Sequence, residues 1–159
     1  MALRALALLA FALLAACATS GVGNPASATG GTYVDCSVTD GDELKAVHWI
    51  VSPDGTIEFG GGRDAMNNTM TWKGKMSQQE IDALRALLED DGWYAGTVAG
   101  TGTPKNRNVH VVVKYSDGTR KFNIQGRCDE ADRLEALLQR ASAGRLDPYL
   151  KKLPAASAA

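Results

Sequence analysis

Residues 109–124 read VHVVVKYSDGTRKFNI, and this stretch decides the fold. Apolar side chains dominate Val109–Tyr115, residues 116–119 (SDGT) are typical of a tight turn, and Lys121–Ile124 alternates polar with apolar residues. A period of two indicates strands, and Asp-Gly between two such runs favours a hairpin. The stretch therefore predicts two antiparallel strands joined by a short turn.

A second stretch, residues 47–60 (VHWIVSPDGTIEFG), has the same organisation and predicts another hairpin. Either a weak internal duplication or the preference of hairpin turns for Asp-Gly-Thr accounts for the likeness. Before it, Tyr33–Val38 alternates with apolar residues on one face, and after it Met70 and Trp72 mark a further strand. The glycine run 60–62 lacks the Lys-Ser/Thr of a phosphate-binding loop and predicts a mobile loop.

Two amphipathic helices are expected, one after each hairpin region. Ser77 and Glu80 form a capping box, and Gly92 is a stop signal. The stripe of this first helix consists of Ile81, Leu84, Leu87 and Leu88. Cys128 or Asp129 caps the second helix, whose stripe is Leu134, Leu137, Leu138 and Ala141. Asp147-Pro148 can open a last helical turn.

The resulting order is β-β-β-β-α-β-β-α. It predicts an α+β fold, a mostly antiparallel sheet of about five or six strands with both helices on one face. Hydrophobic residues make up 45% of the 159 and charged residues 22%, which is typical of a soluble globular domain. We assign residues 32–153 to this single domain and 154–159 to a disordered tail.

The N-terminal residues 1–16, MALRALALLAFALLAA, are typical of a signal peptide: Arg4 precedes about a dozen apolar residues, too few to span a bilayer. Leu14-Ala15-Ala16-Cys17 then resembles the lipobox of bacterial lipoproteins. The resemblance covers the first 17 residues and implies cleavage before Cys17 and acylation of its thiol. An ordinary secretory signal, cleaved after Ala18, is the competing interpretation.

The resemblance also implies a location. Lipoproteins of Gram-negative bacteria without Asp after the cysteine are sorted to the outer membrane, and Ala18 and Thr19 follow here. We therefore expect an anchor on the periplasmic face of the outer membrane, or on the extracytoplasmic face of the cell membrane in other bacteria. Residues 17–31 are rich in Gly, Ser, Thr and Ala and predict a flexible tether.

Two cysteines remain once Cys17 is acylated. Cys36 is expected on the inward face of its strand, and Cys128 at the first turn of a helix that packs on that face. Outside the inner membrane such a pair predicts a disulfide. A reactive thiol at a helix N-terminus and two inert buried thiols are the alternatives.

His48 and His110, the only histidines, lie on separate predicted strands. With a carboxylate such as Asp35 or Glu58 they could bind zinc, but the sequence has no HExxH and no third ligand at a diagnostic spacing. Half-exposed strand histidines without a chemical role are the favoured interpretation. There is also no Gly-x-Ser-x-Gly. We therefore predict no catalytic residue, no metal and no cofactor.

Charge is distributed unevenly along the chain. The formal net charge of −1 gives no general attraction to nucleic acid. Residues 32–59 hold six acidic residues and one basic residue, whereas residues 101–127 hold six basic residues and one acidic residue. Either neighbouring strands pair these charges, or the basic segment faces an acidic partner. The loop Thr97–Asn108 is the favoured binding segment, with Lys105 and Arg107 as contacts.

These patterns predict an anchored, non-catalytic binding module. Its sheet face or the loop at 97–108 would contact another envelope protein or a cell-wall component, and its acyl chains the membrane. A small hydrolase or metal-dependent enzyme using His48 and His110, and a structural spacer without a specific ligand, are the alternatives.

Overall fold

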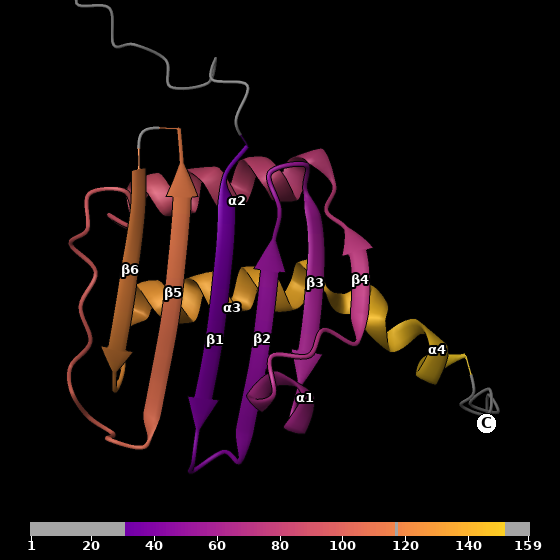
Figure 1. Ribbon diagram of the computed structural model, residues 1–159, viewed down its shortest axis with the longest axis horizontal. Coiled ribbons are helices and arrows are strands. Elements are labelled where there is room, and N and C mark those ends of the chain that lie inside the picture. Colours follow the sequence, from indigo (N-terminus) through magenta and orange to yellow (C-terminus); the bar gives the residue numbers. More distant parts are fainter. Residues whose placement is uncertain (1–30, 117, 152–159) are drawn as a thin grey trace, which may run out of the picture.

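Six strands form one antiparallel sheet in the order β4-β3-β2-β1-β5-β6 (Figure 1). The computed structural model describes residues 31–116 and 118–151. The strands are β1 (Tyr33–Asp40), β2 (Lys45–Val51), β3 (Thr56–Gly61), β4 (Trp72–Lys75), β5 (Arg107–Tyr115) and β6 (Gly118–Gln125). The predicted α+β fold is confirmed. β1 lies between the two predicted hairpins. It pairs with β2 of the first hairpin and with β5 of the second, so that both hairpins belong to one sheet.

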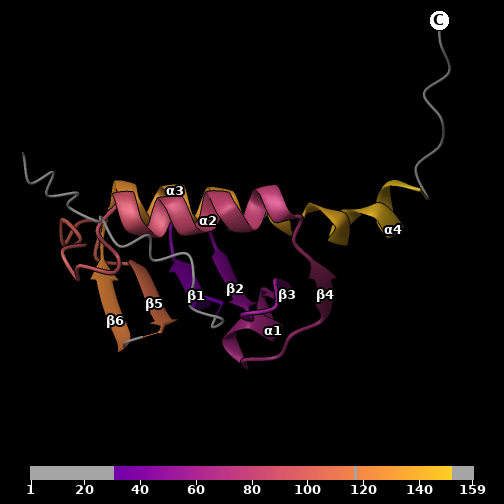
Figure 2. The same ribbon diagram turned by 90° about the horizontal axis from the view of Figure 1, so that it is seen from above.

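Two long helices, α2 (Gln78–Asp90) and α3 (Asp129–Ala141), lie side by side on one face of the sheet (Figure 2). The predicted capping box begins α2: Ser77 Oγ accepts from the Glu80 amide, and Glu80 accepts from the Ser77 amide at 2.7 Å. Gly92, with φ 78°, follows its end, as the stop signal predicts. α3 begins after Cys128, which makes no side-chain capping bond.

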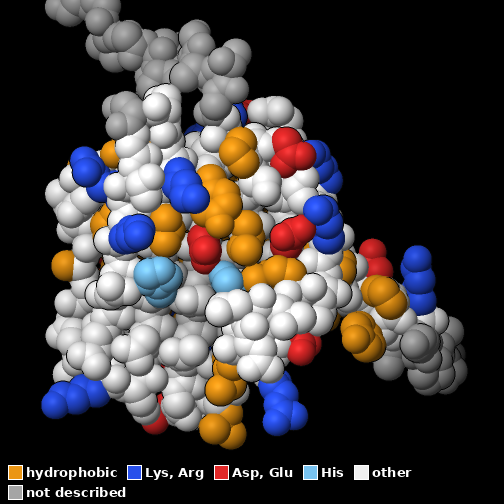
Figure 3. All heavy atoms as spheres, in the orientation of Figure 1, with side chains coloured by type: hydrophobic (Ala, Val, Ile, Leu, Met, Phe, Trp, Pro, Cys, Tyr) orange, Lys and Arg blue, Asp and Glu red, His pale blue; other side chains and the backbone are white. Residues whose placement is uncertain are grey.

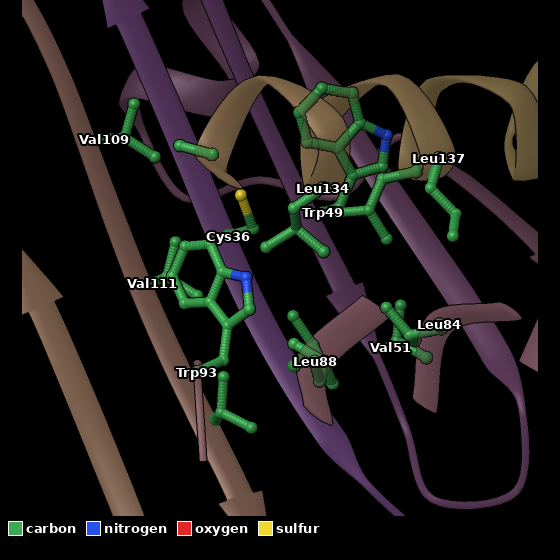
Figure 4. Close-up of a cluster of buried hydrophobic side chains, with 14 of the residues drawn as sticks. Cys36, Trp49, Val51, Leu84, Leu88, Trp93, Val109, Val111, Leu134 and Leu137 are labelled. Atoms are coloured by element: carbon green, nitrogen blue, oxygen red, sulfur yellow. The ribbon is translucent and has the colours of Figure 1, made fainter. Parts of the chain in front are cut away.

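The core fills the space between the helices and the inward face of the sheet (Figure 4). Even-numbered residues of β1 and odd-numbered residues of β2 and β5 point into it, as their alternation predicts. Trp49 and Trp93 are fully buried there, and the Trp49 indole donates to Ser142 Oγ at 3.1 Å. The predicted stripes of both helices contribute Leu84, Leu88, Leu134 and Leu138.

The other face of the sheet, here called the open face, is only partly covered. A short helix, α1 (Arg63–Met66), lies on this side over β2 and β3 (Figure 2). Gly60 permits the crossing, because a Cβ there would lie 2.3 Å from the Thr69 carbonyl oxygen. The prediction of a mobile loop at 60–62 is therefore wrong. Gly60 and Gly61 belong to β3, and Gly60 allows the chain at Thr69 to cross closely.

The chain after α3 continues through a short 3-10 helix, η2 (Ala143–Leu146), into α4 (Asp147–Leu150). The helical turn predicted at Asp147-Pro148 is thus confirmed. The expected signal peptide, the acylated Cys17, nearly all of the tether and the C-terminal tail lie outside the described residues. No helix within the described part of the chain is long and apolar enough to cross a membrane.

Candidate functional site

The sheet register brings both histidines into one row on the open face. His48 in β2 pairs with Ser37 in β1, Ser37 pairs with His110 in β5, and His110 pairs with Asn123 in β6. Although they belong to separate hairpins, the two histidines are thus separated by one strand. Figure 3 shows them near each other at the centre of this face.

His48 is buried, with 6% of its surface exposed. Its Nε2 lies 2.8 Å from Asp35 Oδ1, and its Nδ1 has no hydrogen-bond partner among the described residues. The hydrogen bond from His48 lowers the pKa of the Asp35 carboxyl, although partial burial opposes the shift. The expectation of a half-exposed histidine is therefore wrong at this position, because α1 covers β2 on the open face.

His110 is exposed, and its Nδ1 lies 2.7 Å from Asn123 Oδ1. The two carboxylates considered as metal ligands have other partners: Asp35 bonds to His48, and Glu58 forms an ion pair with Lys73 at 2.9 Å. Within residues 31–116 and 118–151, no group of three or more His, Cys, Asp or Glu residues could hold a metal ion.

A shallow groove of about 360 Å³ begins at this histidine row and extends along β1, β5 and β6. Six of its lining residues carry hydrogen-bonding side chains, namely Ser37, Thr39, Asn108, His110, Asn123 and Gln125. Side-chain amides and hydroxyls offer both donors and acceptors, which suits a neutral polar ligand. Sequence reasoning missed this groove, because no single segment contains it.

The open face has unpaired positive charge. The acidic residues of its strands and of the β2–β3 turn have partners, since Asp35 bonds to His48, Glu58 to Lys73, and Asp54 of the turn to Lys75. By contrast, Lys114 and Lys121 have no acidic partner among the described residues. Figure 3 shows basic side chains gathered over β5 and β6.

A second, larger cavity of about 470 Å³ lies where β1 ends, β5 begins and α3 passes. Arg107 is buried there, and its guanidinium contacts Asp40, Asp132, Glu135 and the Gly126 carbonyl. These acids neutralise the guanidinium within the domain, so a ligand would have to compete with them. Arg107 therefore joins α3 to the sheet.

Lys105, the other predicted contact, is exposed on the preceding loop and does not line this cavity. The structure does not bring it together with Arg107, which already belongs to β5. The loop instead follows β6: the amides of Thr101 and Gly102 donate to the carbonyls of Arg127 and Gln125 at 3.0 and 2.8 Å.

Cys36 and Cys128 are free and buried, in place of the predicted disulfide. Both belong to the core between sheet and helices, so their expected placement is correct. Cys36 is level with Val111 and Phe122 at mid-sheet, whereas Cys128 follows the end of β6 and directs its thiol to Glu130 Oε2 at 3.2 Å. Burial raises the pKa of both thiols, which matches the alternative of two inert cysteines.

Comparison with known proteins gives no relative: no family model matches the chain, and no curated protein matches it.

Proposed function

We propose that this chain is an envelope lipoprotein, anchored through acylated Cys17, that presents a small non-catalytic binding domain. We place the anchor on the periplasmic face of the outer membrane. The Leu-Ala-Ala-Cys sequence at 14–17 supports the anchor. The partner would be another envelope protein or a cell-wall component.

The observation that carries the binding role is the asymmetry of the sheet. One face is covered by α2 and α3 and supplies the core. The open face has a groove of hydrogen-bonding side chains and two exposed lysines, Lys114 and Lys121, that have no acidic partner among the described residues. Surfaces with several unsatisfied, convergent polar groups on rigid strands are suited to ligand binding.

The binding role is tested by affinity capture from solubilised envelopes with the tagged, Cys17-intact chain. Asn123→Ala removes an exposed amide from the groove, and Gln79→Ala removes an exposed amide from the outer side of α2. We expect a specific partner to be lost with Asn123→Ala and retained with Gln79→Ala. Equal capture by both variants would contradict a binding role of the open face.

The anchor is tested separately by intact-mass measurement of protein extracted from membranes. We expect loss of residues 1–16 and added mass from acyl chains on Cys17, and we expect Cys17→Ala to block normal processing. A soluble, unlipidated protein beginning at Thr19 would show that the signal is an ordinary secretory one.

The shared row of His48 and His110 favours one second candidate, a small hydrolase or metal-dependent enzyme. A catalytic histidine must reach a substrate, yet Nδ1 of His48 is buried and has no hydrogen-bond partner among the described residues. His110 is the accessible member of the row. Stoichiometric zinc, or a hydrolase turnover lost in the folded His48→Ala, His110→Ala double variant, would favour the enzyme over the binding module.

A further inference from the structure

We propose that the open-face groove binds an acidic saccharide. The neutral side chains of the groove would contact sugar hydroxyls, and Lys121 and Lys114 would contact carboxylate or phosphate groups. This inference rests on the proposed binding role of the open face and names the chemistry of its ligand.

The charge of the ligand follows from which ion pairs the domain makes. The acidic segment 32–59 is largely matched: five of its carboxylates have a basic partner, and these are Asp35, Asp40, Glu43, Asp54 and Glu58. In the basic segment 101–127, Arg107 alone forms an ion pair with a described residue. Pairing between these segments thus occurs at Asp40 and Arg107, and the other five basic residues have no acidic partner among the described residues.

Two of these basic residues, Lys121 and Lys114, lie beside the groove. Lys121 is on β6, two residues from Asn123, and its strand partner is Val112. Lys114 follows Val112 by two residues on β5 and so lies on the same face of the sheet. Its Nζ lies 4.4 Å from the centre of the Tyr33 ring. The groove and the two lysines therefore form one continuous strip along β5 and β6, neutral at one end and cationic at the other.

The neutral end has the hydrogen-bonding capacity that a sugar requires. Neither Ser37 Oγ nor the amide nitrogen of Asn123 has a hydrogen-bond partner among residues 31–116 and 118–151, and the amide oxygen of Asn123 lies 2.7 Å from His110 Nδ1. A sugar hydroxyl both donates and accepts, so adjacent hydroxyls match amide and hydroxyl side chains. Because these side chains stand on strands, their spacing is fixed before a ligand arrives.

A peptide fits this surface less well than a saccharide. Extended peptides bind by adding a strand to a free sheet edge, with pockets for alternate side chains. The groove lies on the face of the sheet across β1, the beginning of β5 and the end of β6, where these strands already pair with one another. The chain at 100–103 lies against the outer side of this end of β6. Six of the eight residues that line it have polar side chains, and the other two, Val109 and Ile124, are buried in the core. The groove therefore offers no exposed apolar side chain to anchor a hydrophobic residue.

The test measures binding to the full-length chain, purified from membranes in detergent, by titration calorimetry at low salt. The probes are tetragalacturonate as an acidic saccharide, maltotetraose as a neutral one, tetraglutamate as an acidic peptide, and glycerophosphoglycerol as the soluble headgroup of phosphatidylglycerol. We expect tetragalacturonate to bind more tightly than the other probes, and added salt to weaken it because exposed charges are screened.

Two matched pairs of variants locate the site. Lys121→Gln and Arg140→Gln each remove one exposed positive charge, the first beside the groove and the second on α3. Asn123→Ala and Gln79→Ala each remove one exposed amide. We expect Lys121→Gln and Asn123→Ala to weaken tetragalacturonate binding about fivefold or more, as loss of one exposed charge or hydrogen-bond contact does, and the two control variants to bind as the wild type does.

The remaining outcomes overturn the inference. They are absence of tetragalacturonate binding at millimolar concentration, equal or tighter binding of maltotetraose, tetraglutamate or glycerophosphoglycerol, and equal weakening by Arg140→Gln. Loss of the captured partner with Asn123→Ala, together with a failed saccharide titration, would keep the binding role and reject the ligand class. A partner captured equally by Asn123→Ala and Gln79→Ala would reject the binding role itself.

Discussion

At the scale of single residues, the contact between Asp35 and His48 gives the domain a specific response to acid. The carboxylate accepts a hydrogen bond from a buried ring, and the pKa of Asp35 is lower than its ordinary value. A carboxyl group whose pKa is lowered by folding stabilises the fold above its unfolded pKa of about 4, and this stabilisation is lost as the pH falls through the folded pKa.

We therefore expect Asp35→Asn to lower the free energy of unfolding by about 1 kcal/mol at pH 7, since Asp35 is partly exposed. The difference from the wild type should begin to shrink as the pH falls below about 4 and should be lost once the pH is below the lowered pKa of the folded Asp35 carboxyl. Urea unfolding at several pH values measures both. Asp90→Asn, at an exposed carboxyl without a described partner, is the control. A difference independent of pH would show that the charge of Asp35 is irrelevant.

The two buried thiols give a second prediction at this scale. Burial raises the pKa of Cys36 and Cys128, so both remain protonated and shielded at neutral pH. We expect iodoacetamide to leave both unmodified in the native protein and to label both in denaturant without any reductant, as mass spectrometry of peptides would show. If the thiols are labelled only after a reductant is added, Cys36 and Cys128 form the predicted disulfide.

At the scale of elements, two glycines of the run 60–62 separate steric from conformational effects where the chain crosses over β3. A Cβ at Gly60 would clash with the Thr69 carbonyl, whereas Gly62 has open space but a φ of 58°. We expect Gly60→Ala to cost about 2 kcal/mol by displacing this crossing and Gly62→Ala about 1 kcal/mol through backbone strain alone.

Only Gly60→Ala should also uncover His48, because it alone forces the chain off β3. Chemical unfolding measures the two costs, and modification of histidine by diethyl pyrocarbonate reports the exposure of the ring. Similar histidine reactivity in both variants would contradict the steric role of Gly60.

At the scale of the whole molecule, local patterns predict the elements, and long-range pairing decides the site. The strands at 33–38 and 109–115 and the cap at Ser77 follow from periods and caps that a few residues define. The short helix α1 has four residues and no amphipathic stripe, so no sequence pattern predicts it. The row from His48 to Asn123 depends on β1 lying between the hairpins, and pairing over such distances leaves no local signal. The sheet face that the sequence suggested as a contact surface remains the better candidate for the binding site. Arg107, the other suggested contact, instead forms ion pairs that join α3 to the sheet.

The loop before β5 has a further consequence for self-association. A sheet has two outer strands, and unprotected ones recruit strands from other copies into polymers. β4 is short and carries two lysines, a common deterrent, while the chain at 100–103 occupies the outer end of β6. We expect deletion of residues 97–102 to convert a monodisperse protein into oligomers with intermolecular β-structure, seen by light scattering and thioflavin fluorescence, whereas deletion of the C-terminal residues 152–159 should leave it monodisperse. The segment first considered as a binding loop would then act as a guard against polymerisation, which the proposed lipid anchor would favour by confining many copies to one membrane plane.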